Sequence, residues 1–342
     1  MTSNTAALTI VPSPEHNLDS HPENVHRFSQ LQQTLEALRS PRLLHLPPRA
    51  ATPEELIRVH PPSFLEALKD ACDEGPGYID YAPTYVTVGS FAAALEAAGS
   101  TLGVLDAILD GKADAGLALV RPPGHHATPT RAMGFCLLNN IALAARHAQA
   151  HGLHRVMIVD FDVHHGNGTQ DATEADPDIL YLSTHQMGIY PGSGAIDDTG
   201  SGAGRGSVVN IPLPGGAGDH AFAQIAEHVI APLAERFVPE ILLVSAGFDA
   251  HWRDPLAGIQ LSIAGYYALG QALAAIAQAH CHGRIVYALE GGYDPEVLAE
   301  GIRAVALSLA GEPLTAVPLG PAPRPEPEVD AVLEQVRALH GL

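Results

Sequence analysis

The distribution of apolar residues along the chain predicts strands and helices in alternation. Short, nearly continuous runs of Val, Ile, Leu and Ala are typical of strands that are buried on both faces of a sheet. These runs occupy residues 115–120, 155–159, 179–183, 207–211, 241–245 and 284–289. Longer segments with helical periodicity separate them. This order predicts an α/β fold in which a mainly parallel sheet carries helices on both faces.

Several of the intervening segments have recognisable helix beginnings. Ser90 precedes an alanine-rich segment, and Asp219 begins a segment that ends near Phe237. Ser262 is placed to cap the segment that follows it, because a serine oxygen can accept from a free backbone N–H. Asp294 is followed directly by proline, which combines an N-cap with a favourable first helical residue. We therefore expect a helix after each of these four positions.

The two ends of the chain have a different pattern. The first 90 residues are irregular and rich in proline, which predicts helices and loops wrapped against the sheet. Residues 318–327 read PLGPAPRPEP, which is typical of a stiff, extended linker, and residues 328–342 predict a short helix. We expect one domain over residues 1–317, with the linker and helix of residues 318–342 packed on it or trailing it.

Composition excludes some classes of function. The 342 residues carry a formal net charge of −20, so the chain lacks the basic surface that direct nucleic-acid binding requires, whereas cationic substrates are compatible with it. Three cysteines are too few for a disulfide framework and favour a reducing compartment. Neither an export signal nor an uninterrupted apolar stretch of bilayer length is evident. We expect a cytoplasmic protein that does not bind membranes.

Residues suited to metal binding follow two of the predicted strands. An open parallel sheet binds its ligands beyond the carboxyl ends of its strands. Asp162 and His164 follow the run at 155–159, and their spacing of two points them to the same side of an extended segment. Asp249 follows the run at 241–245. A single aspartate here would usually cap a loop, but this density of carboxylates and imidazole predicts a metal site.

Two further strand ends carry candidate catalytic groups. His125 and His126 follow the run at 115–120 in a loop stiffened by prolines. Adjacent histidines are equally consistent with a solvated loop, but beside a metal they become a general acid and base pair. Tyr293 follows the run at 284–289 after two glycines. A lone tyrosine is usually a packing residue, whereas here its hydroxyl could donate to an oxyanion.

Two aromatic residues are candidates for the walls of a substrate site. Phe135 stands between Gly134 and Cys136, ahead of a predicted helix, and Tyr190 precedes a proline and a glycine. Such rings could simply cover the edge of the sheet. If they face one another, they form a narrow slot for an extended aliphatic chain.

Taken together, these segments resemble the histone deacetylase and acetylpolyamine amidohydrolase family, which has the arginase–deacetylase fold. The resemblance extends from about residue 16 to about residue 311. It rests on the motifs HNLDSHPENVHR, RPPGHH, GFCLLNN, DFDVHHGNGTQ, SAGFDA and EGGY, which occur in this order. Asn167, where class I members carry aspartate, and Glu290 before the glycines are similar to class II and to bacterial histone deacetylase-like amidohydrolases.

The resemblance implies a role for each matched residue. The metal ligands would be Asp162, His164 and Asp249. The catalytic groups would be His125, His126 and Tyr293, with Asp160 orienting the first histidine and Asn167 the second. The substrate would be bound by Gly134, Phe135, Tyr190 and Leu256. A potassium ion would lie beside Asp160, Asp162, His164, Ser183 and Thr184.

The implied reaction is hydrolysis of an acyl amide by a metal-activated water. Zinc is the expected metal, although two carboxylates and one imidazole also suit Fe(II) or Co(II). His126 would take the proton from water, while the histidine that protonates the leaving amine is left open by the sequence. Arginases place an aspartate where this chain has Gly166, so a second, bridged metal is not expected.

Three functions are compatible with these residues. The first is removal of acetyl or other short acyl groups from lysine side chains of a protein or peptide, and the second is deacetylation of polyamines. Leu256 favours the first, because the eukaryotic polyamine-selective relatives that the chain resembles carry an acidic residue there. Residues 71–85 are short for the inserted loop of bacterial polyamine enzymes, although Asp73, Glu74 and Asp80 could meet a cation. A non-catalytic scaffold is the third, but such a protein would be expected to lack one of the site residues.

Overall fold

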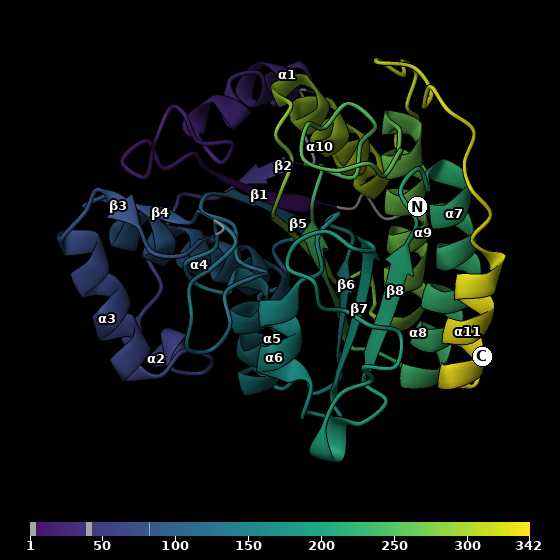
Figure 1. Cartoon of the computed structure of the whole chain (residues 1–342), viewed down its shortest axis with the longest axis horizontal. Coiled ribbons are helices and arrows are strands. Elements are labelled where there is room, and N and C mark those ends of the chain that lie inside the picture. Colours follow the sequence, from purple (N-terminus) through teal and green to yellow (C-terminus); the bar gives the residue numbers. More distant parts are fainter. Residues whose placement is uncertain (1–4, 39–42, 82) are drawn as a thin grey trace.

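Eight parallel strands form the central sheet of the protein (Figure 1). The computed structural model describes residues 5–38, 43–81 and 83–342. The strands are β1 (Ala6–Val11), β2 (Leu43–His45), β5 (Ala115–Val120), β6 (Val156–Asp160), β7 (Ile179–Gln186), β8 (Val208–Leu213), β9 (Ile241–Ala246) and β10 (Ile285–Leu289). Their order is β2-β1-β5-β10-β9-β6-β7-β8, and each neighbouring pair is parallel. The predicted α/β fold with a mainly parallel sheet is confirmed.

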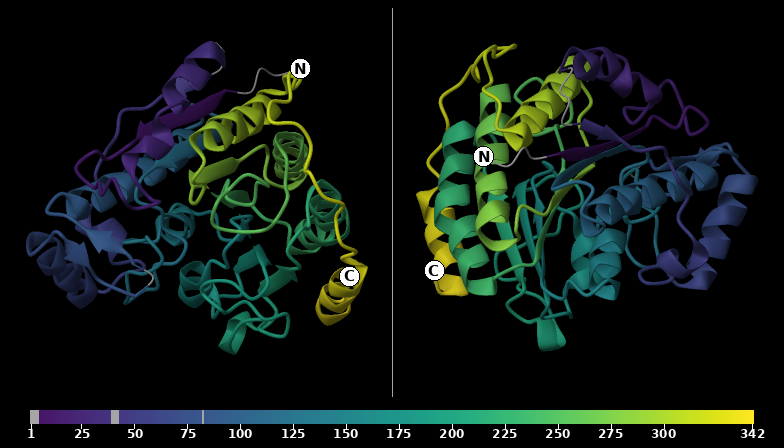
Figure 2. Two further views of the ribbon diagram at one scale, coloured as in Figure 1. Left: turned by 45° about the horizontal axis from the view of Figure 1, so that its top comes forward. Right: turned by 180° about the vertical axis from the view of Figure 1, so that it is seen from behind.

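Helices cover both faces of this sheet (Figures 1 and 2). One layer holds α2 (Pro53–Leu56), α3 (Pro62–Asp73), α4 (Ser90–Leu109), α5 (Asn140–Ala150) and α6 (Asn167–Thr173). The other holds η1 (Val25–Phe28), α1 (Leu31–Leu38), α7 (Asp219–Ile225), η3 (Ala226–Ile230), α8 (Ala231–Phe237), α9 (Ile263–His280), α10 (Pro295–Ala310) and α11 (Asp330–His340). Both faces need this cover because the strands are apolar on both sides. In β5, for example, Leu117 and Leu119 face one core, and Ala118 and Val120 face the other.

The N-terminal region contains strands that the sequence analysis did not predict. Strand β1 lies between β2 and β5, and its register pairs Ala6 with Ala115. A small antiparallel pair, β3 (Gly77–Tyr78) and β4 (Tyr85–Val86), lies farther along. The expectation of helices and loops alone was therefore wrong for this region. The segment AALTIV is an apolar run of six residues that is almost fully buried, and it pairs on both sides, as an inner strand of the sheet does.

The predicted helix beginnings are largely confirmed. The side chain of Ser262 accepts from Gly265 N, and that of Asp294 accepts from the backbone N–H groups of Glu296 and Val297. The segment that begins at Asp219 is α7, which continues through a π-helical turn, η3, into α8. Helix α4 differs slightly, because it begins at Ser90 itself and Gly89 precedes it without a side-chain cap.

Helix α4 is long and apolar enough to cross a membrane by length and composition alone. In the structure, 67% of that stretch is buried. At Gly99 an added Cβ would lie 2.2 Å from the backbone of Ala50 and Ala51, so the helix is packed closely against the preceding segment. It is the core helix of its layer.

The parallel arrangement brings the candidate residues together. Strands β5, β10, β9 and β6 are consecutive neighbours in the sheet. Because they run in the same direction, the loops that follow them leave the same edge of the sheet. These loops carry the histidine pair, the Glu-Gly-Gly-Tyr segment, Asp249 and the Asp-x-His segment, respectively.

Candidate active site

The three predicted metal ligands form a compact group at this edge. Nδ1 of His164 lies 3.2 Å from Oδ1 of Asp162 and 3.3 Å from Oδ2 of Asp249. The ligand atoms of all three side chains lie within 4.8 Å of one another. Both carboxylates are fully buried. A spacing of this kind allows one cation to contact all three groups.

The backbone around these carboxylates leaves space for a cation. Gly291 N donates to Asp162 Oδ2 (2.8 Å), and Val163 N donates to Asp249 Oδ1 (3.1 Å). The second oxygen of Asp249 is buried without a hydrogen-bond partner among the described residues. A Cβ on Gly291 would lie only 2.0 Å from that oxygen. The polar group that faces this oxygen, at 3.3 Å, is Nδ1 of His164, which is itself a candidate ligand. A buried carboxylate oxygen that accepts no hydrogen bond is costly unless a cation meets it, so these residues fit a divalent metal ion.

His125 is held by a carboxylate as expected. Its Nδ1 lies 3.1 Å from Oδ2 of Asp160, which also accepts from the hydroxyl of Tyr181 (3.0 Å). Burial by itself lowers the pKa of His125, but the carboxylates of Asp162, Asp160 and Glu290 raise it to about 10. The surroundings of this imidazole therefore favour its protonated form.

His126 has the opposite environment. Its Nδ1 lies 2.8 Å from Oδ1 of Asn167. An amide oxygen only accepts, so Nδ1 carries the proton and Nε2 keeps its lone pair. Burial and the neighbouring charges of His125 and His164 lower the pKa of His126 well below its ordinary value. The surroundings of the two adjacent histidines therefore favour opposite protonation states.

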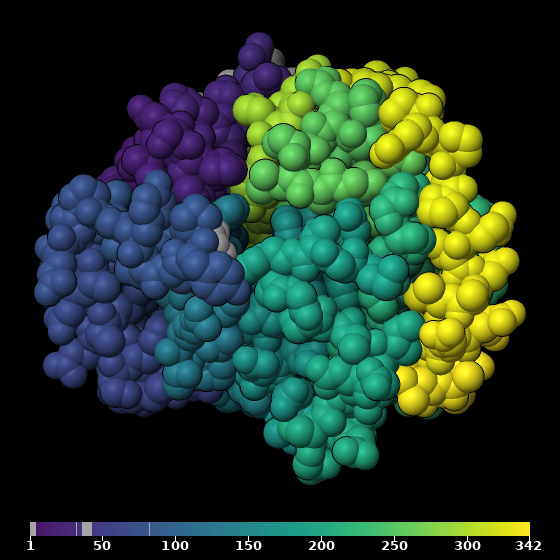
Figure 3. Space-filling model, viewed as in Figure 1, coloured from purple at the N-terminus to yellow at the C-terminus, as the bar shows by residue number. Residues whose placement is uncertain are grey.

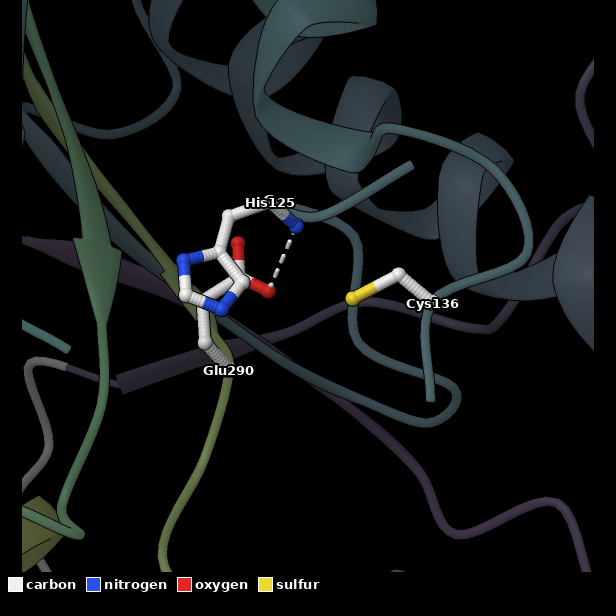
Figure 4. A group of neighbouring side chains, drawn as sticks. All are labelled: His125, Cys136 and Glu290. Carbon is white, nitrogen blue, oxygen red and sulfur yellow. Dashed lines mark hydrogen bonds between the residues drawn. The ribbon is translucent and has the colours of Figure 1, made fainter. Parts of the chain in front are cut away.

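Glu290 anchors the histidine loop, which is a role that the sequence did not suggest. Its Oε2 accepts from Gly124 N (2.7 Å) and His125 N (3.0 Å), and its Oε1 accepts from Ser245 Oγ (3.0 Å). Figure 4 shows the bond to His125 and the thiol of Cys136 nearby. That thiol donates to Gly134 O (3.4 Å). His125, Cys136 and Glu290 could also surround a metal, but these hydrogen bonds already occupy the carboxylate and the thiol.

Tyr293 is positioned by two residues that the sequence analysis did not single out. Its backbone N donates to Oδ2 of Asp254 (2.7 Å), and the guanidinium carbon of Arg27 lies 4.9 Å from its ring centroid. Arg27 also donates to Gly292 O (2.7 Å) and Glu290 O (2.6 Å). Arg27 ends the HPENVHR segment, so its motif was visible, but its partners are more than 260 positions away.

A cavity of about 580 Å³, including its open mouth, leads to this group. The lining residues are Pro83, Pro123, His125, His126, Gly134, Phe135, His164, Tyr190, Leu256, Gly291 and Tyr293. All four predicted wall residues are therefore present, and the two prolines were not predicted. Figure 3 shows a hollow in the surface. Around it meet segments from the N-terminal third of the chain, from its middle and from the region around residue 255.

Several other predicted residues do not line this cavity. Ser183 pairs with Asp160 in the sheet, and Thr184 Oγ1 donates to Asp160 O (3.3 Å), so the candidate potassium ligands are neighbours. Asp80 accepts from Gly134 N (3.3 Å) close to the wall. Asp73 instead forms an ion pair with Lys69 at the end of α3.

Gly166 lies where a second metal would need a carboxylate. A Cβ at this position would lie 2.1 Å from Asp160 Oδ2 and 3.2 Å from His125 Nδ1. The Tyr181 hydroxyl lies 3.0 Å from its carbonyl oxygen. A carboxylate side chain at this position would therefore clash with the groups that hold His125.

Comparison with known proteins identifies the family. Residues 21–309 match the family described as "Histone deacetylase domain". The chain belongs to the histone deacetylase family. Its members are hydrolytic deacetylases, and this protein has the arginase–deacetylase fold of the family.

Named relatives of this histone deacetylase family member come from plants, bacteria and animals. "Histone deacetylase 14, chloroplastic" of Arabidopsis thaliana is 45% identical over 315 residues, covering 87% of this chain and 74% of that protein. "Histone deacetylase-like amidohydrolase" of Pseudomonas aeruginosa is 41% identical, with 80% and 71% covered. "Polyamine deacetylase HDAC10" of Homo sapiens is 39% identical over 84% of this chain but only 45% of that protein.

A solved structure supports the fold assignment. The crystal structure of the HDA15 HD domain superposes with a TM-score of 0.89 at 36% sequence identity. The match covers 98% of this chain and 96% of the other. The resemblance that the motifs indicated is therefore confirmed at the level of family and fold.

Proposed function

We propose that this family member removes acetyl, or other short acyl, groups from lysine side chains in a reaction that depends on a bound divalent metal. The observation that carries the proposal is the position of the Asp162–His164–Asp249 group. It lies at the cavity that is also lined by the histidine pair and Tyr293. A metal-binding group, a proton acceptor and a hydrogen-bond donor around one cavity are the parts that amide hydrolysis requires.

Zinc is the metal that we propose. Asp162, His164 and Asp249 would hold it, and it would supply a Lewis acid that polarises the amide carbonyl and lowers the pKa of water. The oxygen-rich ligand set also suits Fe(II) or Co(II). A potassium ion beside Asp160 remains a further proposal, supported by the closeness of Ser183 and Thr184 to that residue.

The histidines would divide the proton transfers between them. His126 Nε2 has a free lone pair because Asn167 fixes the proton on Nδ1, so it would take the proton of the attacking water. His125 faces a carboxylate at Nδ1, so it would stay protonated and assist through its charge. Either imidazolium could then protonate the leaving amine.

Tyr293 and the aromatic walls would bind the substrate. The Tyr293 hydroxyl would donate to the oxyanion of the tetrahedral intermediate. Its ring lies 6.0 Å from Phe135 in a perpendicular arrangement, and Tyr190 lies 5.0 Å from His126. Apolar walls of this kind suit the methylene chain of an acyl-lysine.

Leu256 supports acyl-lysine over acetylpolyamine as the substrate class. Its apolar side chain lines the cavity. A polyamine carries a further positively charged amine, and an apolar side chain offers no negative charge to pair with it. Similarity to human HDAC10, which is named a polyamine deacetylase, supports acetylpolyamine as the second candidate. The acidic net charge of −20 is compatible with either cationic substrate.

The experiment that separates these candidates compares kcat/KM for an acetyl-lysine peptide and for acetylspermidine. We expect the zinc-loaded wild type to prefer the peptide. In Leu256→Glu, the ratio of kcat/KM for acetylspermidine to kcat/KM for the peptide should rise about tenfold, because the new carboxylate can pair with the second amine. Leu256→Gln is the control, since glutamine has the same size and no charge. A wild-type preference for acetylspermidine would overturn the lysine assignment. Binding without turnover of either substrate, or of longer acyl-lysines, would favour the scaffold function.

A further inference from the structure

The C-terminal segment is bound to the domain rather than loosely attached. The family match ends at residue 309 and α10 ends at Ala310. Residues 312–329, which we call the C-terminal strap, have no helix or strand and lead into α11. In Figures 1 and 2 the strap runs past the α7 side of the molecule. Helix α11 then buries Leu333 and Val336 in the core.

Glu326 of the strap binds the beginning of α7. Its carboxylate accepts three backbone hydrogen bonds: from Gly218 N (2.9 Å), His220 N (3.0 Å) and Ala221 N (3.1 Å). These N–H groups have no partner within the helix, and a negative charge is favourable there. A Cβ on Gly218 would lie 3.0 Å from the Glu326 carboxyl carbon, so the approach is close.

A second contact joins the strap to the segment before α9. Arg324 Nε donates to Oε1 of Gln260 (3.1 Å). The side-chain amide of Gln260 donates to Gly216 O (3.0 Å), and its backbone N donates to Ala217 O (2.7 Å). Gln260 is buried. The strap, residues 216–221 and residues 258–262 therefore form one hydrogen-bonded unit.

This unit continues to the mouth of the cavity. Gly216 N donates to Gly258 O (2.7 Å), and Gly258 N donates to the Gln186 side chain (2.6 Å). Two residues earlier, Leu256 N donates to Oδ1 of Asp254 (3.0 Å). Leu256 itself lines the cavity. Two hydrogen bonds, Gly218 to Glu326 and Gly216 to Gly258, together with the short peptide segments between them, therefore join the strap to the cavity wall.

We infer that the C-terminal strap is a latch for the loop of residues 254–261, and that Glu326 is a positioning residue which sets the affinity of the cavity for substrate. When Glu326 holds the beginning of α7, Gly216 and Gly258 are fixed and Leu256 is held at the cavity wall. Loss of the latch leaves the metal group and the histidine pair in place, because neither contacts the strap. The inference rests on the proposed function only for the test that measures KM with an acyl-lysine substrate.

The test compares Glu326→Gln with Glu328→Gln in the full-length, zinc-loaded protein. Both substitutions remove one negative charge from the strap, but Glu328 is exposed and forms no hydrogen bond or ion pair with the described residues. Glutamine keeps the shape of the side chain while weakening its bonds to the three N–H groups. In Glu326→Gln, we expect KM for an acetyl-lysine peptide to rise about two- to tenfold while kcat stays nearly unchanged. Without the latch, the substrate must order the loop of residues 254–261 when it binds, and this ordering weakens binding.

Hydrogen exchange gives the second, activity-independent readout. The amides of Gly216, Gly258 and Gln260 should exchange about tenfold faster in Glu326→Gln, and those of β6 should not change. Faster exchange with unchanged KM would overturn the effect on affinity. Unchanged exchange at these amides would overturn the latch itself. If the wild type hydrolyses no acyl-lysine, the proposed function fails while the exchange result still decides the latch.

Discussion

At the scale of single residues, the central prediction concerns the hydroxyl of Tyr293. Tyr293→Phe keeps the backbone bond to Asp254 and the ring contacts with Phe135 and Arg27, so the fold and the metal group should be intact. Only the proposed oxyanion donor is lost. We expect kcat to fall about 100- to 1,000-fold, which is typical for removal of one such donor.

Two measurements on the same preparation check this prediction. Metal content should equal that of the wild type, and turnover of an acetyl-lysine peptide should be almost lost. Turnover at the wild-type rate would remove Tyr293 from the mechanism. Loss of metal together with activity would instead show that the residue supports the metal group.

The sequence predicted the residues of the site better than it predicted their supports. The metal-ligand candidates lie together as the sequence predicted, and Gly291 allows this close approach, because a Cβ there would lie 2.0 Å from Asp249 Oδ2. By contrast, Glu290 could be recognised only as part of a motif. Its three hydrogen bonds come from segments 45 to 166 positions away, and no local pattern encodes such distances.

At the scale of elements, a buried histidine joins the turn between α2 and α3 to the beginning of α5. Nδ1 of His60 lies 3.1 Å from Pro129 O, and Nε2 lies 2.9 Å from Asn139 N. The first contact requires a proton on Nδ1 and the second requires a lone pair on Nε2, so the ring is neutral in the fold. Burial lowers the pKa of His60 to about 4.

This histidine should make stability depend on pH. Its folded pKa lies below the ordinary value of 6.5, so the unfolded chain binds more protons between pH 6.5 and pH 4. The contribution of His60 to the free energy of unfolding is complete above pH 6.5 and is lost as the pH falls towards 4. The loss is at most about 1.4 kcal/mol per pH unit.

Urea unfolding of wild type and His60→Asn across this range measures the effect. Asparagine can still donate to Pro129 O but does not titrate. The difference in free energy of unfolding between the two proteins should shrink as the pH falls, since contributions from other histidines cancel. A difference that stays constant with pH would contradict the assignment.

Element prediction succeeded where local pattern was sufficient. All six apolar runs are strands, with ends within three residues of those expected, because a strand buried on both faces has a continuous apolar signature. Strand β1 is an apolar run of six residues, like the predicted strands. The sequence analysis missed it because it lies in the proline-rich N-terminal region, which was interpreted as helices and loops, and its partners β2 and β5 became apparent only in the structure.

At the scale of the whole molecule, the parallel sheet explains why separate motifs make one site. The histidine pair, the Asp-x-His segment, Asp249 and Tyr293 follow four strands that are adjacent in space but not in sequence. The sequence analysis expected these strand ends to converge, but their order in the sheet came only from the structure. A metal held by Asp162, His164 and Asp249 would join the loops after β6 and β9.

The most direct test of the central claim is the release of acetate from an acetyl-lysine peptide by protein stripped of metal and then reloaded. We predict that the stripped protein is folded and inactive, and that about one equivalent of Zn²⁺ per chain restores hydrolysis. Hydrolysis at the same rate before and after stripping would contradict a metal-dependent mechanism. A folded, zinc-loaded protein that releases no acyl group from any acyl-lysine peptide would contradict the proposed activity.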